Sequence, residues 1–178
     1  MKIALVGAHN TGKTTLFNKM YGSHHFAGYE FFREVVREVQ NLGFVINEGA
    51  DDATQLAMCA LHLNHLKYQS FVTDRCLLDN LVYAWVLASG ENPTVSLDCV
   101  KTIDSYFRKT KDDIDLYIYC PIEFEMENDG VRTVNKEFQQ IIDRTFNYML
   151  KSISEDKILR VSGPSDERFK QVVNRLAQ

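Results

Sequence analysis

A chain of 178 residues with 45% hydrophobic side chains can bury one sizeable core, so we expect a single domain over residues 1–178. Its formal net charge of −4 argues against a general nucleic-acid binder, because such proteins rely on clustered Lys and Arg to displace counterions. The first residues fit a strand rather than a signal peptide, the four cysteines stand singly, and no apolar run approaches the ~20 residues of a membrane span. These features favour a cytoplasmic protein without membrane contact.

The hydrophobic pattern predicts strands that alternate with helices along the whole chain. Apolar runs bounded by turn residues predict five strands, at about residues 2–6, 29–32, 70–74, 114–120 and 157–161. Helical spacing of apolar residues predicts helices at about 13–20, 35–42, 51–68, 77–88, 95–109, 136–152 and 165–177. This alternation favours a three-layer α/β fold with a five-stranded parallel sheet, in which ligands bind at the carboxyl ends of the strands.

The first predicted strand leads directly into a phosphate-binding loop. Residues 7–14, Gly-Ala-His-Asn-Thr-Gly-Lys-Thr, match the P-loop pattern G-x-x-x-x-G-K-[ST] and precede a helical pattern. Gly7 and Gly12 allow the backbone angles that turn amide N–H groups towards a phosphate. Lys13 is expected to reach the β- and γ-phosphates of ATP, and the Thr14 hydroxyl to ligate Mg²⁺. The remaining nucleotide-binding residues predicted here are Asn10, Thr11 and Thr15.

Two charged residues follow the second predicted strand and should face the same cleft. Glu34 could accept the proton of an acceptor hydroxyl, or bind a ribose or base, while Arg33 could bind the acceptor or a phosphate. The alternative is that they begin a solvated helix, because Arg37 and Glu38 nearby are also charged.

The third predicted strand ends in Asp74, which is followed by Arg75. Asp74 stands where a Walker-B-type acid would hold Mg²⁺, and it is a second candidate for the residue that takes the acceptor proton. It could instead cap the following helix. Arg75 could bind substrate through a phosphate, or form an ordinary salt bridge.

The segment of residues 123–135 is acidic, contains Gly130 and lacks clear periodicity, which is typical of a mobile lid. Arg132 lies in its Asp-Gly-Val-Arg stretch. An arginine on such a segment can close onto the transferring phosphate as a catalytic residue and exclude water, which prevents wasteful hydrolysis of ATP.

In this order, the motifs resemble those of the small P-loop nucleoside and nucleotide kinases. The closest resemblance is to the AAA-like group that includes the ribosylnicotinamide kinase domain of the bifunctional NAD-biosynthesis regulator. The matching stretches are residues 7–16, 30–34, 71–74 and 129–132. The resemblance implies a kinase fold that uses ATP and Mg²⁺. Thr73-Asp74-Arg75 replaces the Asp-Thr-Asp pattern of the riboside kinase, and this Asp-Arg pair looks more like thymidylate and deoxynucleoside kinases, whose arginine contacts phosphate.

We therefore expect an ATP-dependent kinase, a monomer or homodimer, that phosphorylates a nucleoside, a nucleotide or a related small metabolite. One alternative is a P-loop NTPase that acts as a nucleotide-switched binding module, for which Gln55, Gln139 and Gln140 are unplaced candidates to orient water. Another is a kinase acting on hydroxymethylated bases in DNA, as found in bacteriophages, although the acidic charge balance makes DNA a less favoured partner.

Overall fold

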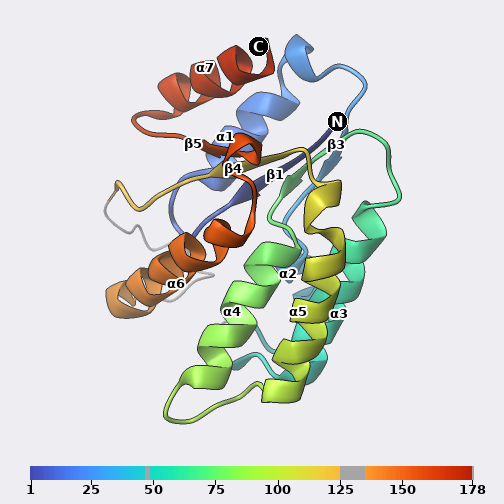
Figure 1. The fold of residues 1–178 in the computed structure, drawn as a ribbon, viewed down its shortest axis with the longest axis vertical. Coiled ribbons are helices and arrows are strands. Elements are labelled where there is room, and N and C mark those ends of the chain that lie inside the picture. The colour runs from blue at the N-terminus through green and yellow to red at the C-terminus, as the bar shows by residue number, and fades with distance from the viewer. Residues whose placement is uncertain (47–48, 125–134, 178) are drawn as a thin grey trace.

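The computed structural model describes residues 1–46, 49–124 and 135–177, in which strands alternate with helices (Figure 1). The strands are β1 (Lys2–Val6), β2 (Glu30–Phe32), β3 (Phe71–Asp74), β4 (Leu116–Tyr119) and β5 (Ile158–Arg160). The helices are α1 (Lys13–Tyr21), α2 (Val36–Asn41), α3 (Asp52–His65), α4 (Leu77–Ser89), α5 (Leu97–Thr110), α6 (Lys136–Met149) and α7 (Ser165–Leu176). Short 3-10 helices are η1 (His24–Phe26), η3 (Lys111–Asp113), η4 (Leu150–Ser152) and η5 (Glu155–Lys157).

The strands form one parallel sheet in the order β2-β3-β1-β4-β5, which confirms the predicted sheet. β1 is central because it pairs with β3 on one side and β4 on the other. All strands run in the same direction, so the loops that follow Val6, Phe32 and Asp74 leave from one edge of the sheet. This edge carries the P-loop and the polar residues predicted for the site.

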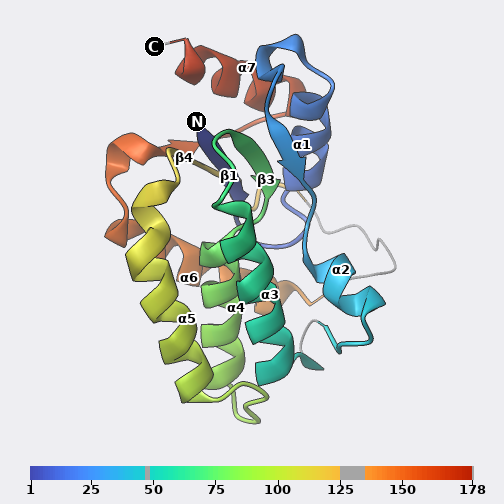
Figure 2. The same cartoon turned by 90° about the vertical axis from the view of Figure 1, so that its right-hand side faces the viewer.

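Each face of the sheet is covered by its own set of helices, because successive strand residues point to opposite faces. Ile3 and Leu5 of β1 pack in one apolar cluster with residues of α1 and α7. Ala4 and Val6 pack in a second cluster with residues of α3, α4, α5 and α6. Figures 1 and 2 show α1 and α7 on one side of the sheet and these four helices on the other. The result is the predicted three-layer architecture.

Most element boundaries lie within one to three residues of those predicted, and α3 shows why they shift. Its pattern continues to residue 68, but the helix ends at His65. The N–H of Leu66 donates to Leu63 O at 3.2 Å, and the carbonyl of Leu66 accepts from Lys2 Nζ at 2.7 Å. A contact with β1 thus ends the helix where local periodicity would extend it. Within the described ranges, no helix has the length and apolar character needed to cross a membrane.

Candidate active site

The P-loop between β1 and α1 depends on two glycines. Gly7 has φ 136°, and a Cβ atom there would lie 2.5 Å from the carbonyl oxygen of Cys120, so only glycine fits. Gly12 has φ 81° and is the N-cap of α1. Asn10 adopts φ 55°, a left-handed conformation that asparagine tolerates better than most residues. The loop therefore has the backbone conformation of a phosphate cradle at the start of a helix.

Lys13 is buried and its ammonium group lies within the loop. Its Nζ donates to Gly7 O at 2.8 Å, to Ala8 O, and to Thr11 Oγ1 at 3.2 Å. Burial, together with the nearby positive charge of Arg75, lowers the pKa of Lys13 to about 7. A bound phosphate would favour the charged form, so the loop and Lys13 suit an anionic ligand.

Thr14 and Asp74 lie together beside the loop. Thr14 Oγ1 donates to Asp74 Oδ2 at 2.7 Å, and Asp74 Oδ1 is buried with no hydrogen-bond partner in the described part of the chain. Hydroxyl and carboxylate oxygens are the ligands that Mg²⁺ takes in phosphate-binding sites, so this pair fits the predicted metal. Asp74 does not cap the next helix. The N-cap of α4 is Cys76, in a capping box with Asp79.

Glu34, Arg75 and Asp79, here called the Arg75 cluster, come from three places in the chain and pair with one another. Arg75 Nε donates to Glu34 Oε1, and Arg75 Nη1 donates to Asp79 Oδ1 at 3.2 Å. The guanidinium also lies 5.4 Å from the centre of the Tyr83 ring. Arg75 has φ 85°, an uncommon conformation for a residue with a side chain that marks a candidate functional position.

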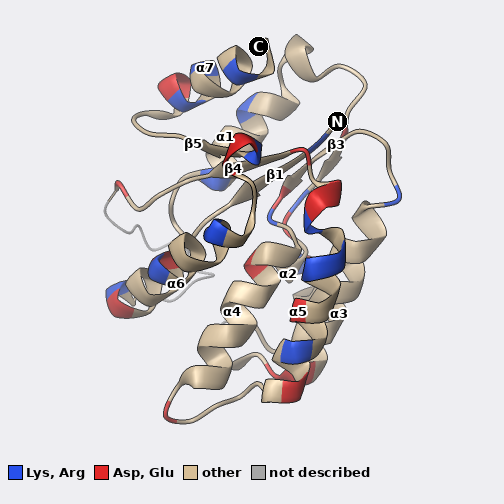
Figure 3. Ribbon diagram, viewed as in Figure 1, with Lys and Arg blue, Asp and Glu red and all other residues tan. Residues whose placement is uncertain are grey.

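The Arg75 cluster is electrostatically linked to the P-loop. Burial raises the pKa of Asp79, while Arg75 and Lys13 oppose that rise. Burial alone would lower the pKa of Arg75, but Glu34, Tyr83 and the two aspartates hold it well above its usual value. Asp79 is the one charged residue in the sequence of α4, and Figure 3 shows the acidic position at the helix end nearest the sheet. The charged residue of this largely apolar helix thus lies in its first turn, beside Arg75.

The other predicted site residues lie elsewhere. Arg33 is exposed and its guanidinium points to α1, 3.5 Å from Asn18 Oδ1 and 6.0 Å from the centre of the Phe17 ring. It is separated from Glu34 because neighbouring residues of an extended chain point in opposite directions. Thr15 is exposed in the first turn of α1. Arg132 and residues 125–134 of the lid predicted at 123–135 lie outside the described residues.

Sequence reasoning missed several residues that surround the loop. Asp79 carried a usable signal, since it is an acid four residues after Arg75 in an apolar helix. Tyr83, which contacts His9 Nδ1 at 3.1 Å, carried none. Gln139 and Arg168 were also missed as ligands of the P-loop backbone, because nothing in the periodicity of α6 or α7 distinguishes them.

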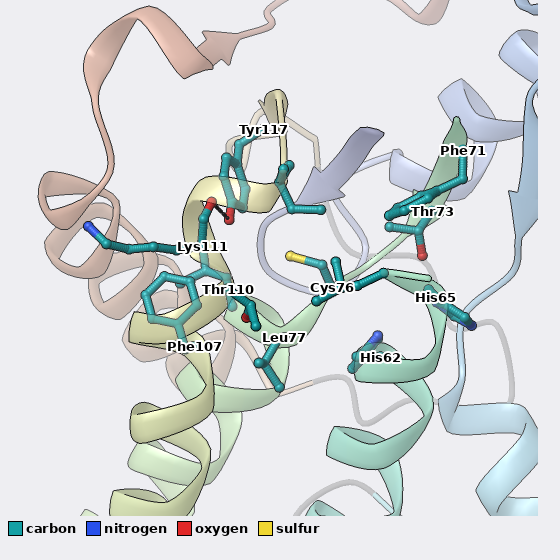
Figure 4. A pocket seen from close by; sticks show the side chains of 13 residues that line it. His62, His65, Phe71, Thr73, Cys76, Leu77, Phe107, Thr110, Lys111 and Tyr117 are labelled. Atoms are coloured by element: carbon teal, nitrogen blue, oxygen red, sulfur yellow. Dashed lines mark hydrogen bonds between the residues drawn. The ribbon is translucent and has the colours of Figure 1, made fainter. Parts of the chain in front are cut away.

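A cavity of about 20 Å³ lies beneath the Arg75 cluster, between the sheet and helices α3, α4 and α5. Figure 4 shows His62 and His65 of α3 at one end and Tyr117 and Lys111 at the other. A cavity of this size holds about one water molecule. It is too small for a nucleoside.

Comparison with known proteins supports this fold. The NadR protein in complex with NR has a TM-score of 0.76 at 18% identity, over 98% of this chain and 50% of that one. NadR in complex with NAD and AMP-PNP has a TM-score of 0.73 at 17% identity, over 98% of this chain and 48% of that one. This chain thus spans about half the length of NadR.

Deoxyadenosine kinase from M. mycoides, with the products dCMP and a flexible dCDP bound, has a TM-score of 0.70 at 17% identity over 99% of both chains. A search of curated proteins gave no significant match. A family model described as an AAA domain matches residues 2–168. Because that match covers most of the chain, the protein belongs to this AAA domain family, and its five-stranded parallel sheet has the fold of the P-loop nucleoside kinases.

Proposed function

We propose that this protein is an ATP-dependent kinase that transfers the γ-phosphate to a nucleoside, a nucleotide or a related small metabolite. The observation that carries the proposal is the buried Arg75 cluster beside the P-loop. Its carboxylates and guanidinium would supply a proton acceptor and an anion-binding group, and the charge of Arg75 acts on Lys13 of the P-loop. A protein that only binds or hydrolyses ATP does not require this second set of charges.

On the nucleotide side, the loop amides and Lys13 would hold the phosphates of ATP, and Thr14 with Asp74 would hold Mg²⁺. The bound metal ion would neutralise charge on the phosphates. Lys13 would have to leave the carbonyl oxygens of Gly7 and Ala8 to meet the phosphates, and its lowered pKa would return to normal on doing so.

On the acceptor side, Glu34 is the proposed base. The acceptor hydroxyl oxygen forms a bond to the γ-phosphorus, and the bond from that phosphorus to the β,γ-bridging oxygen breaks. The bridging oxygen leaves with the electron pair as part of ADP, and the hydroxyl proton passes to Glu34. Asp74 is less suited to this role because it accepts the hydrogen bond of Thr14. Arg75 would hold the acceptor and release Glu34 from their ion pair. Arg132 is proposed to close over the transfer, and Arg33 to bind substrate from the solvent side.

The solved structures support the acceptor class and no more. NadR was solved with NR and the M. mycoides enzyme is a deoxyadenosine kinase, so both deal with nucleoside-type compounds. Because the sequence identities are only 17–18%, we propose nucleosides and nucleotides as the acceptor class. The acceptor itself is to be found by experiment.

The test is transfer of radiolabelled γ-phosphate from ATP with Mg²⁺ to three separate pools. These are nucleosides including nicotinamide riboside, nucleoside monophosphates, and DNA with normal or hydroxymethylated bases. We expect labelled product in one of the first two pools, formed at least about 10²-fold more slowly by the Lys13→Ala variant. Label in DNA alone would instead identify a DNA-base kinase. Release of free phosphate in every pool, unaffected by acceptor, would refute the kinase assignment and favour the nucleotide-switched NTPase.

A further inference from the structure

Two backbone carbonyls of the P-loop are held by side chains from outside the loop. Gln139 Nε2, on α6, donates to His9 O at 2.6 Å. Arg168 Nη1, on α7, donates to Thr11 O at 2.6 Å. Both side chains are almost fully buried, with exposed fractions of 3% for Gln139 and 1% for Arg168. Buried polar groups placed on two specific carbonyls of the P-loop call for a reason beyond general packing.

The reason lies in the geometry of the peptide unit. In a trans peptide the C=O and the N–H of the next residue point in opposite directions, and the described residues contain no cis peptide bond. When Gln139 holds the carbonyl of His9, the N–H of Asn10 must point away from α6. When Arg168 holds the carbonyl of Thr11, the N–H of Gly12 must point away from α7.

We propose that Gln139 and Arg168 are positioning residues that orient the N–H groups of Asn10 and Gly12 towards the phosphates of the bound nucleotide. This inference rests on the proposed binding of ATP at the P-loop. It adds to the site two residues on helices α6 and α7, which lie far from residues 7–14 in the sequence. Donors fixed before the ligand arrives need no reorganisation when it binds, which is the main source of electrostatic stabilisation in such sites.

Gln139 and Arg168 differ from Lys13, which also donates to carbonyls of the loop. Lys13 donates to Gly7 O and Ala8 O but belongs to the loop, and it is needed by the phosphates. Gln139 and Arg168 come from outside and can keep their hydrogen bonds while a nucleotide is bound. They are therefore the contacts that can preserve the shape of the loop through a catalytic cycle.

Arg168 is itself fixed from several sides. Its Nε donates to Gly163 O at 2.8 Å, its Nη2 donates to Glu123 Oε2 at 2.8 Å, and its guanidinium lies 4.9 Å from the centre of the Phe124 ring. A lysine has one ammonium group in place of this planar fork and cannot meet these partners together. Gln139 lies one residue after Phe138, whose ring centre is 6.0 Å from that of His9. Both donors are thus held rigidly against the loop.

The experiment uses the full chain with Gln139→Met and Arg168→Lys, and with Gln171→Met as a matched control. Gln171 also donates to a backbone carbonyl, that of Ser162 at 2.9 Å, and this hydrogen bond lies outside the P-loop. Three quantities are measured: the Kd for ADP with Mg²⁺, the separate values of kcat and KM for ATP, and the change of the Asn10 and Gly12 amide resonances on adding ADP.

We expect each of the two variants to weaken ADP binding and kcat/KM for ATP by roughly 10- to 100-fold, as for a displaced binding group. The resonances of Asn10 and Gly12 should shift less on ADP binding than in the wild type, whereas Gln171→Met should behave as the wild type in all three measurements. A general loss of stability would lower the melting temperature without this selective change at two amides.

Wild-type affinity and wild-type amide shifts in folded Gln139→Met would overturn the inference while leaving the kinase proposal intact. If Arg168→Lys does not fold, Gln139→Met decides alone. Failure of the wild-type protein to bind ADP or ATP at all would overturn both the inference and the proposed function.

Discussion

The P-loop and the Arg75 cluster are neighbours at one edge of the sheet but are built in opposite ways. The P-loop is one continuous stretch of residues 7–14 whose backbone amides are the proposed phosphate-binding groups. The Arg75 cluster joins side chains from the end of β2, the end of β3 and the first turn of α4. The P-loop needs glycines at fixed spacing, whereas the Arg75 cluster needs β2, β3 and α4 to pack next to one another. A motif can be recognised in the first case, whereas only the fold assembles the second.

The difference also concerns charge. The P-loop presents amide N–H groups and one lysine, which is held by the carbonyl oxygens of Gly7 and Ala8 and has no carboxylate paired with it in these contacts, so the loop suits an anion. The Arg75 cluster pairs its own charges, because Glu34 and Asp79 both accept from Arg75. We expect damage to the P-loop to affect nucleotide binding and damage to the Arg75 cluster to affect transfer.

The largest effect should come from removing the proposed base. Glu34→Gln keeps the size of the side chain but removes its basicity, so kcat should fall by roughly 10²- to 10⁴-fold. The Kd for ADP with Mg²⁺ should stay near the wild-type value, because Glu34 belongs to the other half of the site. Glu38→Gln, at an exposed position of α2, is the matched control for steady-state kinetics. Turnover close to wild type in Glu34→Gln would transfer the role of base to Asp74.

The P-loop side of the comparison is tested by Lys13→Ala. Loss of the ammonium group from the phosphate site should lower kcat by roughly 10²- to 10³-fold, as for other preorganised electrostatic contacts. Nucleotide affinity should fall as well, which Glu34→Gln should not cause. Lys101→Ala, at an exposed position on α5, controls for loss of a positive charge. A kcat of Lys13→Ala close to that of the wild type would refute the kinase assignment.

Comparing a glycine of the P-loop, Gly7, with one outside it, Gly28, separates the effect of backbone strain from that of steric contact. Gly7→Ala should reduce the free energy of unfolding by about 2–3 kcal/mol, because φ is 136° and the new Cβ would meet Cys120 O at 2.5 Å. Gly28→Ala should lower it by only about 1–2 kcal/mol, because φ is 87° but no atom lies within 4 Å. Urea denaturation of both variants measures the difference. Equal losses would show that the neighbouring strand does not constrain the P-loop.

The smallest effect is a pH dependence beneath the Arg75 cluster. Burial and the neighbouring His65 and Arg75 lower the pKa of His62 to about 3, and burial and Lys67 lower that of His65 to about 4. Both values lie below the 6.5 of the unfolded chain, so the unfolded state binds more protons between them. Stability should therefore rise with pH from about 4 to 6.5.

Urea midpoints of the wild type and His62→Asn across this pH range isolate the share of His62, since other groups titrate equally in both. The variant should have the shallower slope. Parallel curves for wild type and His62→Asn would mean that His62 is not kept neutral by the folded protein.

The elements were predictable because their patterns are local. An apolar run such as residues 3–6 must be buried on both faces, and glycines at 7 and 12 with lysine at 13 leave few alternatives to a P-loop. Helix ends were less predictable. The apolar pattern of α3 continues past His65, but the helix ends there, where Lys2 donates a hydrogen bond to the carbonyl of Leu66. Lys2 is 64 positions away in the sequence, so periodicity within the helix cannot predict this contact.

Residue types at fixed places along a strand or loop were enough to predict the fold class, the phosphate loop and the candidate metal ligands Thr14 and Asp74. Which charged side chains pair became clear only from the packing of the elements. That packing directed Arg33 to α1, joined Glu34 to Arg75 and Asp79, and placed Gln139 and Arg168 on the loop carbonyls. These contacts join residues 4 to 157 positions apart, and side-chain direction across such separations is fixed by packing rather than by neighbours in the chain.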